Sequence, residues 1–167
     1  MSNVTRTPEV ELSAGQRTSI DRLMARYCSV IDNAEYEGWP ALFTEDGVYR
    51  ITTRTDFDAG RDFGIWYCCN RAMLADRVTA IRGVNVYEPH VYRHVIGPTE
   101  IVAADASGAS CETGFIVVRT DVDGAMTIFS AGRYVDRLVF DEGRALLRSR
   151  VVVADSARFD TLVALPL

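Results

Sequence analysis

The sequence predicts an α+β domain in which N-terminal helices pack against a strongly curved, mainly antiparallel sheet. In the first half of the chain, apolar residues recur at helical spacing. From residue 91 onward the pattern changes to long runs rich in β-branched and aromatic residues, separated by glycine-containing turns. A sheet curved around the first helix would bury the apolar face of that helix and give one cone-shaped unit.

The clearest predicted helix covers residues 13–34. Ser13 and Gln16 have the spacing of a capping box at its start. Its apolar side chains share one face: Ile20, Leu23, Met24, Tyr27, Cys28 and Ile31. A third helix is predicted over 70–82, with Gly83 as its stop signal and an inward face of Met73, Leu74, Val78 and Ile81. Between them we expect a short helical piece with Trp39, Leu42 and Phe43, a strand at 48–53 and a loop at 54–64.

The second half predicts a meander of four strands, at 91–105, 111–121, 126–140 and 144–154. Ser107-Gly108, Asp123-Gly124 and Glu142-Gly143 have the chemistry of hairpin turns. In the last strand, alternation places Arg144, Arg148 and Arg150 together on one face, beside Arg133 and Arg137 of the preceding strand. Such an arginine face is either solvated or an oligomer contact. A bend or bulge is expected at Gly132.

Composition favours a single domain. The 167 residues suit one core, 48% of them are hydrophobic, and only residues 1–12 have the polar character of a flexible terminus, which leaves 13–167 as the domain. A formal net charge of −5 argues against nucleic acid or an anionic membrane as partner. Because no secretory signal or spanning segment is recognisable, we expect a cytoplasmic protein.

The metal-ligating residue types do not form a recognisable motif. The only histidines, His90 and His94, would lie about 13 Å apart on a strand, too far to share a metal ion. The cysteines Cys28, Cys68, Cys69 and Cys111 contain no C-x-x-C pair, so we expect reduced thiols used in packing. The sequence therefore predicts no metal and no cofactor site in this chain.

Asp32 is the one residue with a catalytic interpretation. It ends the first helix, where that helix would meet the mouth of the curved sheet, and with His94 and Tyr49 it could form an acid–base site. The alternative is that Asp32 begins a solvated turn with Asn33 and that His94 is a hydrogen-bonded histidine near the sheet.

Several segments resemble the small (β) subunits of Rieske-type aromatic-ring-hydroxylating oxygenases. They are residues 71–78 (RAMLADRV), 85–89 (NVYEP), 92–97 (YRHVIG) and 129–136 (FSAGRYVD). Residues 160–167 (DTLVALPL) look like the end of terephthalate dioxygenase small subunits in particular. The adjacent pair Cys68-Cys69 departs from the pattern, where a small or acidic pair is expected. The resemblance implies an NTF2-like, or cystatin-like, fold.

The resemblance also implies that the two kinds of subunit have different functions. In that family the large α subunit carries a Rieske [2Fe–2S] cluster and a mononuclear Fe(II), and a reductase delivers electrons from NADH. The small subunit is a non-catalytic scaffold in an α3β3 hexamer with β–β trimer contacts. The implied substrate is an aryl carboxylate, with terephthalate favoured and salicylate, anthranilate or a halobenzoate as alternatives.

The candidate interface residues are aromatic side chains that flank the third helix and arginines of the strands: Trp66, Tyr67, Tyr87, Tyr92, Arg93, Arg133, Arg148 and Arg150. Two other functions stay open. One is a stand-alone NTF2-like dehydratase or isomerase that uses the Asp32–His94 pair. The other is a non-catalytic ligand-binding dimer.

Overall fold

The computed structural model describes residues 11–83, 88–105 and 107–167. The elements, in order, are α1 (Ala14–Asp32), the 3₁₀ turns η1 (Tyr36–Gly38) and η2 (Pro40–Leu42), β1 (Phe43–Thr53), α2 (Arg54–Asp58), β2 (Trp66–Cys68), α3 (Arg71–Gly83), β3 (His90–Asp105), β4 (Gly108–Asp121), β5 (Met126–Asp141) and β6 (Arg144–Ala154). Most of the N-terminal segment predicted to be flexible, residues 1–10, lies outside the described residues. None of the helices in the described ranges is long and apolar enough to cross a membrane.

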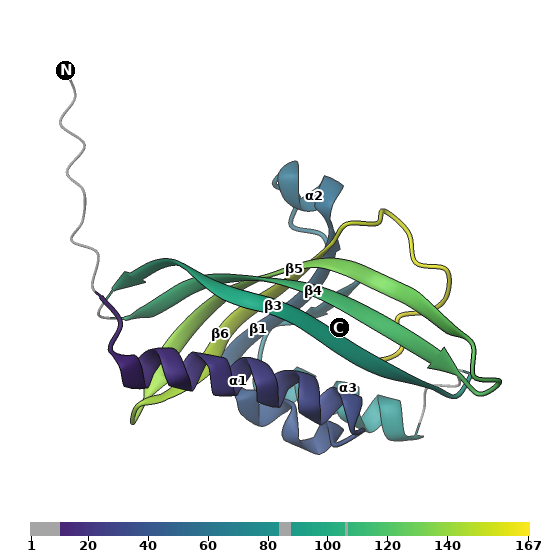
Figure 1. Ribbon diagram of the computed structural model, residues 1–167, viewed down its shortest axis with the longest axis horizontal. Helices are drawn as coiled ribbons and strands as arrows, with labels where there is room; N and C mark the ends of the chain where they lie inside the picture. The colour runs from purple at the N-terminus through teal and green to yellow at the C-terminus, as the bar shows by residue number, and fades with distance from the viewer. Residues whose placement is uncertain (1–10, 84–87, 106) are drawn as a thin grey trace.

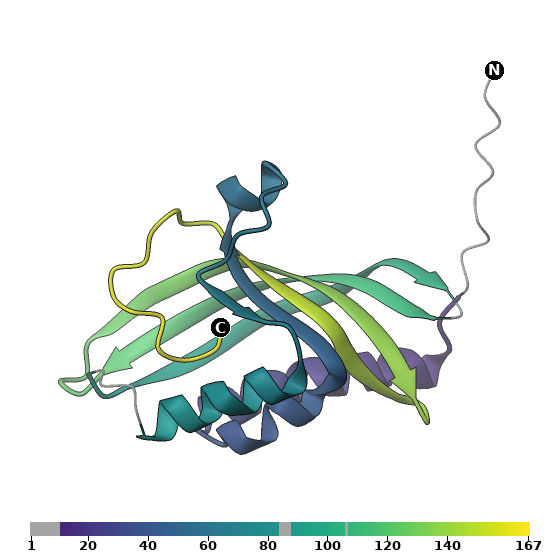
Figure 2. The same ribbon diagram turned by 180° about the vertical axis from the view of Figure 1, so that it is seen from behind.

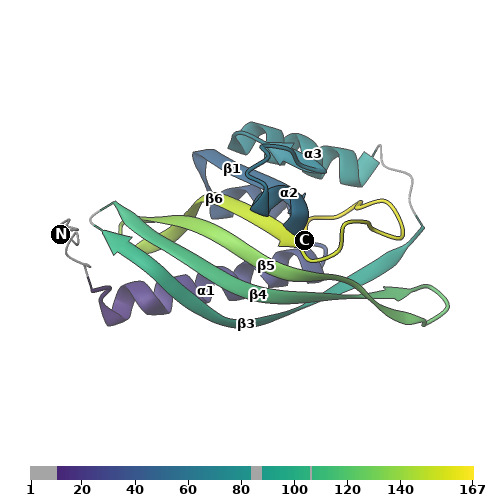
Figure 3. The same cartoon turned by 90° about the horizontal axis from the view of Figure 1, so that it is seen from above.

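The strands form one six-stranded sheet in the order β2-β1-β6-β5-β4-β3. All neighbours are antiparallel except β1 and β6, which run parallel. The sheet curves over α1, and α3 covers the same face beside it (Figures 1 and 2). Seen from above, the long strands β3, β4 and β5 cross the molecule obliquely over α1 (Figure 3). The predicted α+β class and the curved sheet are confirmed.

The two long helices begin where the sequence predicts. The Ser13 hydroxyl accepts a hydrogen bond from the Gln16 amide at 3.2 Å, and the Gln16 side chain accepts one from the Ser13 amide at 2.9 Å, which completes the capping box of α1. Asn70 caps α3 by accepting from the Met73 amide at 2.9 Å. The predicted inward residues of α1 are buried except Cys28, which is half-buried.

Three local predictions need correction. Met73 is 36% exposed and lies outside the buried face of α3, which is made by Leu74, Val78 and Ile81. Residues 54–64 are not all loop, because Thr53 caps the short helix α2 by accepting from the Asp56 amide. Phe43 begins β1 and does not belong to a helical piece. The short edge strand β2 has no counterpart in the prediction.

The largest correction concerns the arginines of β6. The pairing register between β5 and β6 shifts at Leu138. Arg137 pairs with Ser149 and Leu138 pairs with Leu147, so Arg148 is an extra residue of β6 that is not opposite any residue of β5. One extra residue on one strand reverses the faces that follow. Arg150 therefore points into the core, and the uninterrupted alternation expected for this strand is wrong.

Gly132 marks a close approach of β5 to β6. A Cβ atom there would lie 2.0 Å from the backbone oxygen of Val153. We therefore expect Gly132→Ala to destabilise the fold by about 1–3 kcal/mol, as overpacking does elsewhere. Gly114 on the neighbouring strand is the control, since nothing lies within 4 Å of its Cβ position. Equal urea midpoints for the two alanine variants would contradict the prediction.

The C-terminal segment, residues 155–167, has no regular secondary structure but ends inside the molecule. Figures 1 and 2 show it leaving β6, looping past the ends of the strands and returning between the sheet and the helices. Val163, Ala164, Leu165 and Leu167 are all at most 4% exposed. The hydrophobic core of the cone thus includes the end of the chain.

Candidate functional site: a closed interior and an exposed sheet face

Asp32 and His94 meet inside the fold. The His94 Nδ1 atom lies 2.6 Å from Asp32 Oδ1, and the side chains of His94 and Asp32 are 0% and 4% exposed. The His94 backbone amide also donates to Asp32, at 3.0 Å to Oδ2. Outside the pair, Arg93 places Nη1 3.6 Å from Asp32 Oδ2. The expectation of a solvated Asp32 is therefore wrong, whereas His94 is hydrogen-bonded as expected.

The Asp32–His94 contacts can be explained by the fold alone, because the pair joins the end of α1 to the edge strand β3. β3 lies at the edge of the sheet, so backbone groups on its outer side have no neighbouring strand. Asp32, the last residue of α1, accepts the free His94 amide and thereby ties the helix to the edge strand. This contact positions the helix against the sheet without any need for catalysis.

Tyr49, the third member of the acid–base hypothesis, faces the chain's own C-terminus. Its hydroxyl donates to the Leu167 backbone oxygen at 3.1 Å and accepts from the Leu167 amide at 3.0 Å. The volume that a substrate would need next to Tyr49 is thus filled by protein. Burial raises the pKa of Tyr49 well above its ordinary value, so its hydroxyl remains protonated at neutral pH.

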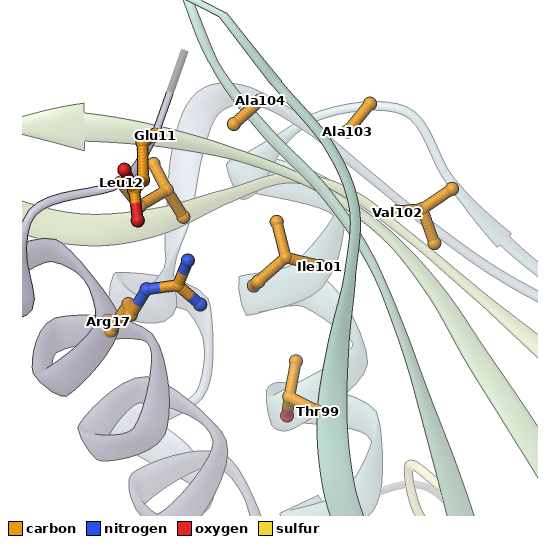
Figure 4. A pocket seen from close by; sticks show the side chains of 8 residues that line it. All are labelled: Glu11, Leu12, Arg17, Thr99, Ile101, Val102, Ala103 and Ala104. Carbon is orange, nitrogen blue, oxygen red and sulfur yellow. The ribbon is translucent and has the colours of Figure 1, made fainter. Parts of the chain in front are cut away.

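Two surface pockets are not lined by any of these residues. One of about 450 Å³ opens between the start of α1 and β3 (Figure 4). In this view Thr99 and Ile101 point toward Arg17, whereas Val102 points away. Another, of about 650 Å³, lies between α1 and the β5–β6 turn. Neither contains a nucleophile next to a base, and within the described ranges no group of His, Cys, Asp or Glu is placed to hold a metal ion.

The four thiols differ in accessibility. Cys69 is exposed, whereas Cys68 and Cys111 are buried. Burial raises the pKa of Cys28 to about 11 and that of Cys111 to about 12. We expect one fast-reacting thiol when the native chain meets an aromatic disulfide reagent at about pH 8. Cys69→Ser should remove the fast phase, and Cys28→Ser should leave it unchanged; a fast phase that survives Cys69→Ser would contradict this assignment.

The outer face of the sheet carries a group of exposed apolar side chains, which we call the outer patch: Val91, Val95, Ile116, Met126 and Ile128. Their exposed fractions range from 41% to 72%. They occupy three adjacent cross-strand rows on β3, β4 and β5, in which Val95 pairs with Ile116 and Val118 pairs with Ile128. A hollow of about 440 Å³ adjoins the patch where Gly97 and Gly114 lack side chains. Contiguous exposed apolar surface of this kind marks an interaction site.

The predicted interface residues divide by burial. Tyr67 is 49% exposed, and the side chains of Arg93 and Arg148 are 69% and 49% exposed. The side chains of Trp66, Tyr92 and Arg150 are in the core and do not reach the surface. Arg133 is half-buried, with Nε 3.4 Å from Glu112. Tyr87 lies outside the described residues.

Sequence reasoning missed the outer patch. The run from Phe115 to Val118 is apolar at every position, which indicates a strand covered on both faces. Within this chain, helices cover only one of them, because Phe115 and Val117 are buried while Ile116 is exposed. That mismatch between an apolar run and a face left uncovered in this chain was the available signal.

Comparison with known proteins agrees with this geometry. Residues 13–151 match the SnoaL-like domain family. The chain is 40% identical over 143 residues to the β2 subunit of the terminal oxygenase component of terephthalate 1,2-dioxygenase from Comamonas sp, which covers 86% of this chain and 93% of that protein. It is 37% identical to the small subunit of anthranilate 1,2-dioxygenase from Burkholderia cepacia, over 87% of this chain and 90% of the relative.

A solved structure gives the same result. The crystal structure of the β subunit of a putative aromatic-ring-hydroxylating dioxygenase from Novosphingobium aromaticivorans superposes with a TM-score of 0.83 at 36% sequence identity, over 90% of this chain and 96% of that one. Family match, sequence identity and structural agreement extend over nearly the whole fold. The chain belongs to the small (β) subunits of aromatic-ring-hydroxylating dioxygenases, within the SnoaL-like, or NTF2-like, fold.

Proposed function

We propose that this chain is a structural subunit that assembles and positions large α subunits in an α3β3 hexamer. The outer patch is the observation that supports this role. Monomeric proteins rarely expose adjacent apolar side chains such as Val95, Ile116 and Ile128. A permanent subunit contact buries about 2,000 Å² or more, and its centre is depleted of charge. The patch supplies such a centre on β4 and β5, and Arg93 lies on the edge strand β3 between Val91 and Val95.

The iron groups belong to the α subunits in this proposal. This chain's own side chains do not fit them, since within the described residues no group of three or more His, Cys, Asp or Glu side chains is placed to hold a metal ion. The α subunits would carry the Rieske [2Fe–2S] cluster and the mononuclear Fe(II), and a reductase would supply electrons from NADH. The role of the β subunit is to hold the large subunits at fixed positions.

The substrate class in the proposal is an aryl carboxylate. Terephthalate is favoured because the 40% identical relative is a terephthalate dioxygenase subunit, and anthranilate is supported by the 37% identical relative. Salicylate and halobenzoates are further alternatives. With Leu167 in place the volume beside Tyr49 is filled, so in this proposal the large subunit binds the aromatic substrate.

Co-expression with a large subunit of the terephthalate or anthranilate type tests the proposal. We expect a coloured complex whose mass, measured by light scattering, equals three copies of each chain. The complex should oxidise its aryl carboxylate when reductase and NADH are added, and the β chain alone should not. A β chain that stays separate from every large subunit of these types would contradict the proposal.

A second candidate function rests on the 2.6 Å contact between His94 and Asp32, which is the geometry of an acid–base pair. In this hypothesis the chain alone is a dehydratase or isomerase. The filled volume beside Tyr49 disfavours it, as does the use of Asp32 to bind a backbone amide. Turnover of a hydroxylated or keto substrate by the iron-free chain, lost in Asp32→Asn, would establish it.

A further inference from the structure

We propose that the C-terminal segment 159–167 is a displaceable plug, and that the interior behind it is a binding site for a compact apolar carboxylate. This inference concerns the isolated β chain and does not depend on the large subunit. It rests on how the segment is held, which donors surround its last residue, and which polar atoms nearby have no partner.

The segment is bound by side chains of the domain, as a separate peptide ligand would be. It belongs to no strand, and its backbone is fixed by side chains of the cone: Trp66 Nε1 donates to the Val163 oxygen at 3.0 Å, and Tyr27 donates to the Leu167 oxygen at 2.7 Å. Near its start, Arg119 Nη1 donates to the Thr161 hydroxyl at 3.1 Å. Each of these bonds joins a side chain to the segment, so the segment can leave without breaking a sheet ladder.

Two hydroxyl groups converge on one oxygen atom. The Leu167 oxygen accepts from Tyr27 at 2.7 Å and from Tyr49 at 3.1 Å, and both tyrosines are 0% exposed. Paired donors aimed at a single buried oxygen are the arrangement that binds a carbonyl or carboxylate group. The isobutyl side chain of Leu167, also 0% exposed, shows that an apolar body fits next to this oxygen.

Further donors lie around the two tyrosines. The Trp39 ring is 5.0 Å from the Tyr49 ring, and the Arg150 guanidinium lies 3.9 Å from the centre of the Tyr27 ring. Trp39 Nε1, Arg150 Nη1 and the Tyr134 hydroxyl are buried and make no hydrogen bond of normal geometry within the described part of the chain. Burial raises the pKa of Tyr27, while Arg150, Tyr49 and Trp39 act in the opposite direction. Buried donors that lack a well-placed acceptor favour an acceptor-rich ligand, and a carboxylate offers four lone-pair sites.

Hydrogen exchange of the unmodified chain tests whether the plug opens. If it opens on its own, the Leu167 amide should exchange at least about 100-fold faster than the amides of β6, which lies between β1 and β5. The probe is 4-methylpentanoate, which carries the isobutyl group of a leucine side chain and a carboxylate. Saturating probe should accelerate Leu167 exchange further and leave the β6 amides unchanged.

Binding of the same probe tests the site. Leu165→Ala shortens a side chain of the plug that is 1% exposed. The shortened plug should bind the interior more weakly and compete less with the probe, so we expect the probe affinity to increase at least about 10-fold. Leu162→Ala is the matched control in the same segment, since Leu162 is 66% exposed, and it should leave the affinity unchanged. Adding Tyr49→Phe to Leu165→Ala should reduce the affinity about 10-fold, because it removes one of the two convergent donors.

Clear results would overturn the proposal. Leu167 exchange at the rate of the β6 amides would show that the segment leaves only in global unfolding. Equal probe affinity of Leu165→Ala and Leu162→Ala, or of the Leu165→Ala chain with and without Tyr49→Phe, would show that no carboxylate site lies behind the segment. If Leu165→Ala does not fold, Val163→Ala takes its place in the same comparison, and the exchange measurement on the unmodified chain decides independently of both.

Discussion

Replacing Arg150 with methionine is expected to destabilise the chain by about 3–5 kcal/mol, a large part of the stability of a domain of this size. Arg150 is 0% exposed and forms a bidentate ion pair with Asp136, with Nε–Oδ1 and Nη2–Oδ2 distances of 2.9 and 2.7 Å. Burial acts to lower the pKa of Arg150, but the Asp136 carboxylate more than offsets it, so the guanidinium stays charged. Methionine fills similar volume but leaves the carboxylate buried without a counter-charge.

The rings of Tyr27 and Tyr134 add to the expected loss. Their centroids lie 3.9 and 4.0 Å from the guanidinium carbon, so the cation is held between two aromatic faces. Urea unfolding followed by circular dichroism measures the effect. Adding Asp136→Leu to Arg150→Met should recover part of the stability, since it removes the uncompensated charge.

Arg148→Met is the matched control. Arg148 lies two residues earlier on β6 and is also ion-paired, with Asp46, but its side chain is 49% exposed. Exposed pairs contribute about 0–1 kcal/mol, so this variant should unfold at nearly the urea concentration of the unmodified chain. Similar midpoints for Arg148→Met and Arg150→Met would show that burial of the Asp136–Arg150 pair is energetically unimportant.

The double substitution Ile116→Glu with Ile128→Glu is expected to abolish assembly with the large subunit. Both residues lie on the outer patch, 41% and 71% exposed, so charge there costs the isolated chain little. In a subunit contact the same carboxylates would be buried without partners, and each such group costs several kcal/mol. Two of them should reduce the affinity by more than about 1,000-fold. Light scattering of the co-expressed complex measures the loss.

Val102→Glu is the control for this substitution. Val102 is 53% exposed but lies on β3 at the register shift between Ile101 and Ala103, beyond the three rows of the outer patch. It should leave the complex and the unfolding midpoint of the chain unchanged. A complex of unchanged mass in the Ile116→Glu, Ile128→Glu variant would mean that the outer patch is not a subunit contact.

Local signals predicted most of the fold. The capping box of Ser13 and Gln16, the helical spacing on α1 and the glycine turns between β3, β4, β5 and β6 all act within a few residues of each other. A pattern read in a short window can find such features. The parallel pairing of β1 with β6 is a long-range contact, and no local pattern specifies it.

The candidate site was harder to predict because a shift of one residue in strand register changes which side chains face the core. The bulge opposite Leu138 moves Arg150 from the expected surface into the core. Asp32 is buried because an edge strand happens to present the His94 amide to it, a contact between residues far apart in sequence. The closing of the interior by Leu167 likewise depends on where an irregular segment returns. The family resemblance, in contrast, was carried by contiguous segments and could be recognised without knowing any of these contacts.

The parallel contact of β1 with β6 also constrains how the protein is made. Val48 pairs with Ser149, about 100 residues later, and Trp66 and Tyr49 bind the backbone of Val163 and Leu167. An elongating chain cannot close its sheet until these later residues have been synthesised. Contacts between such distant segments slow folding, so nascent chains would expose apolar strands for longer than a helical protein does.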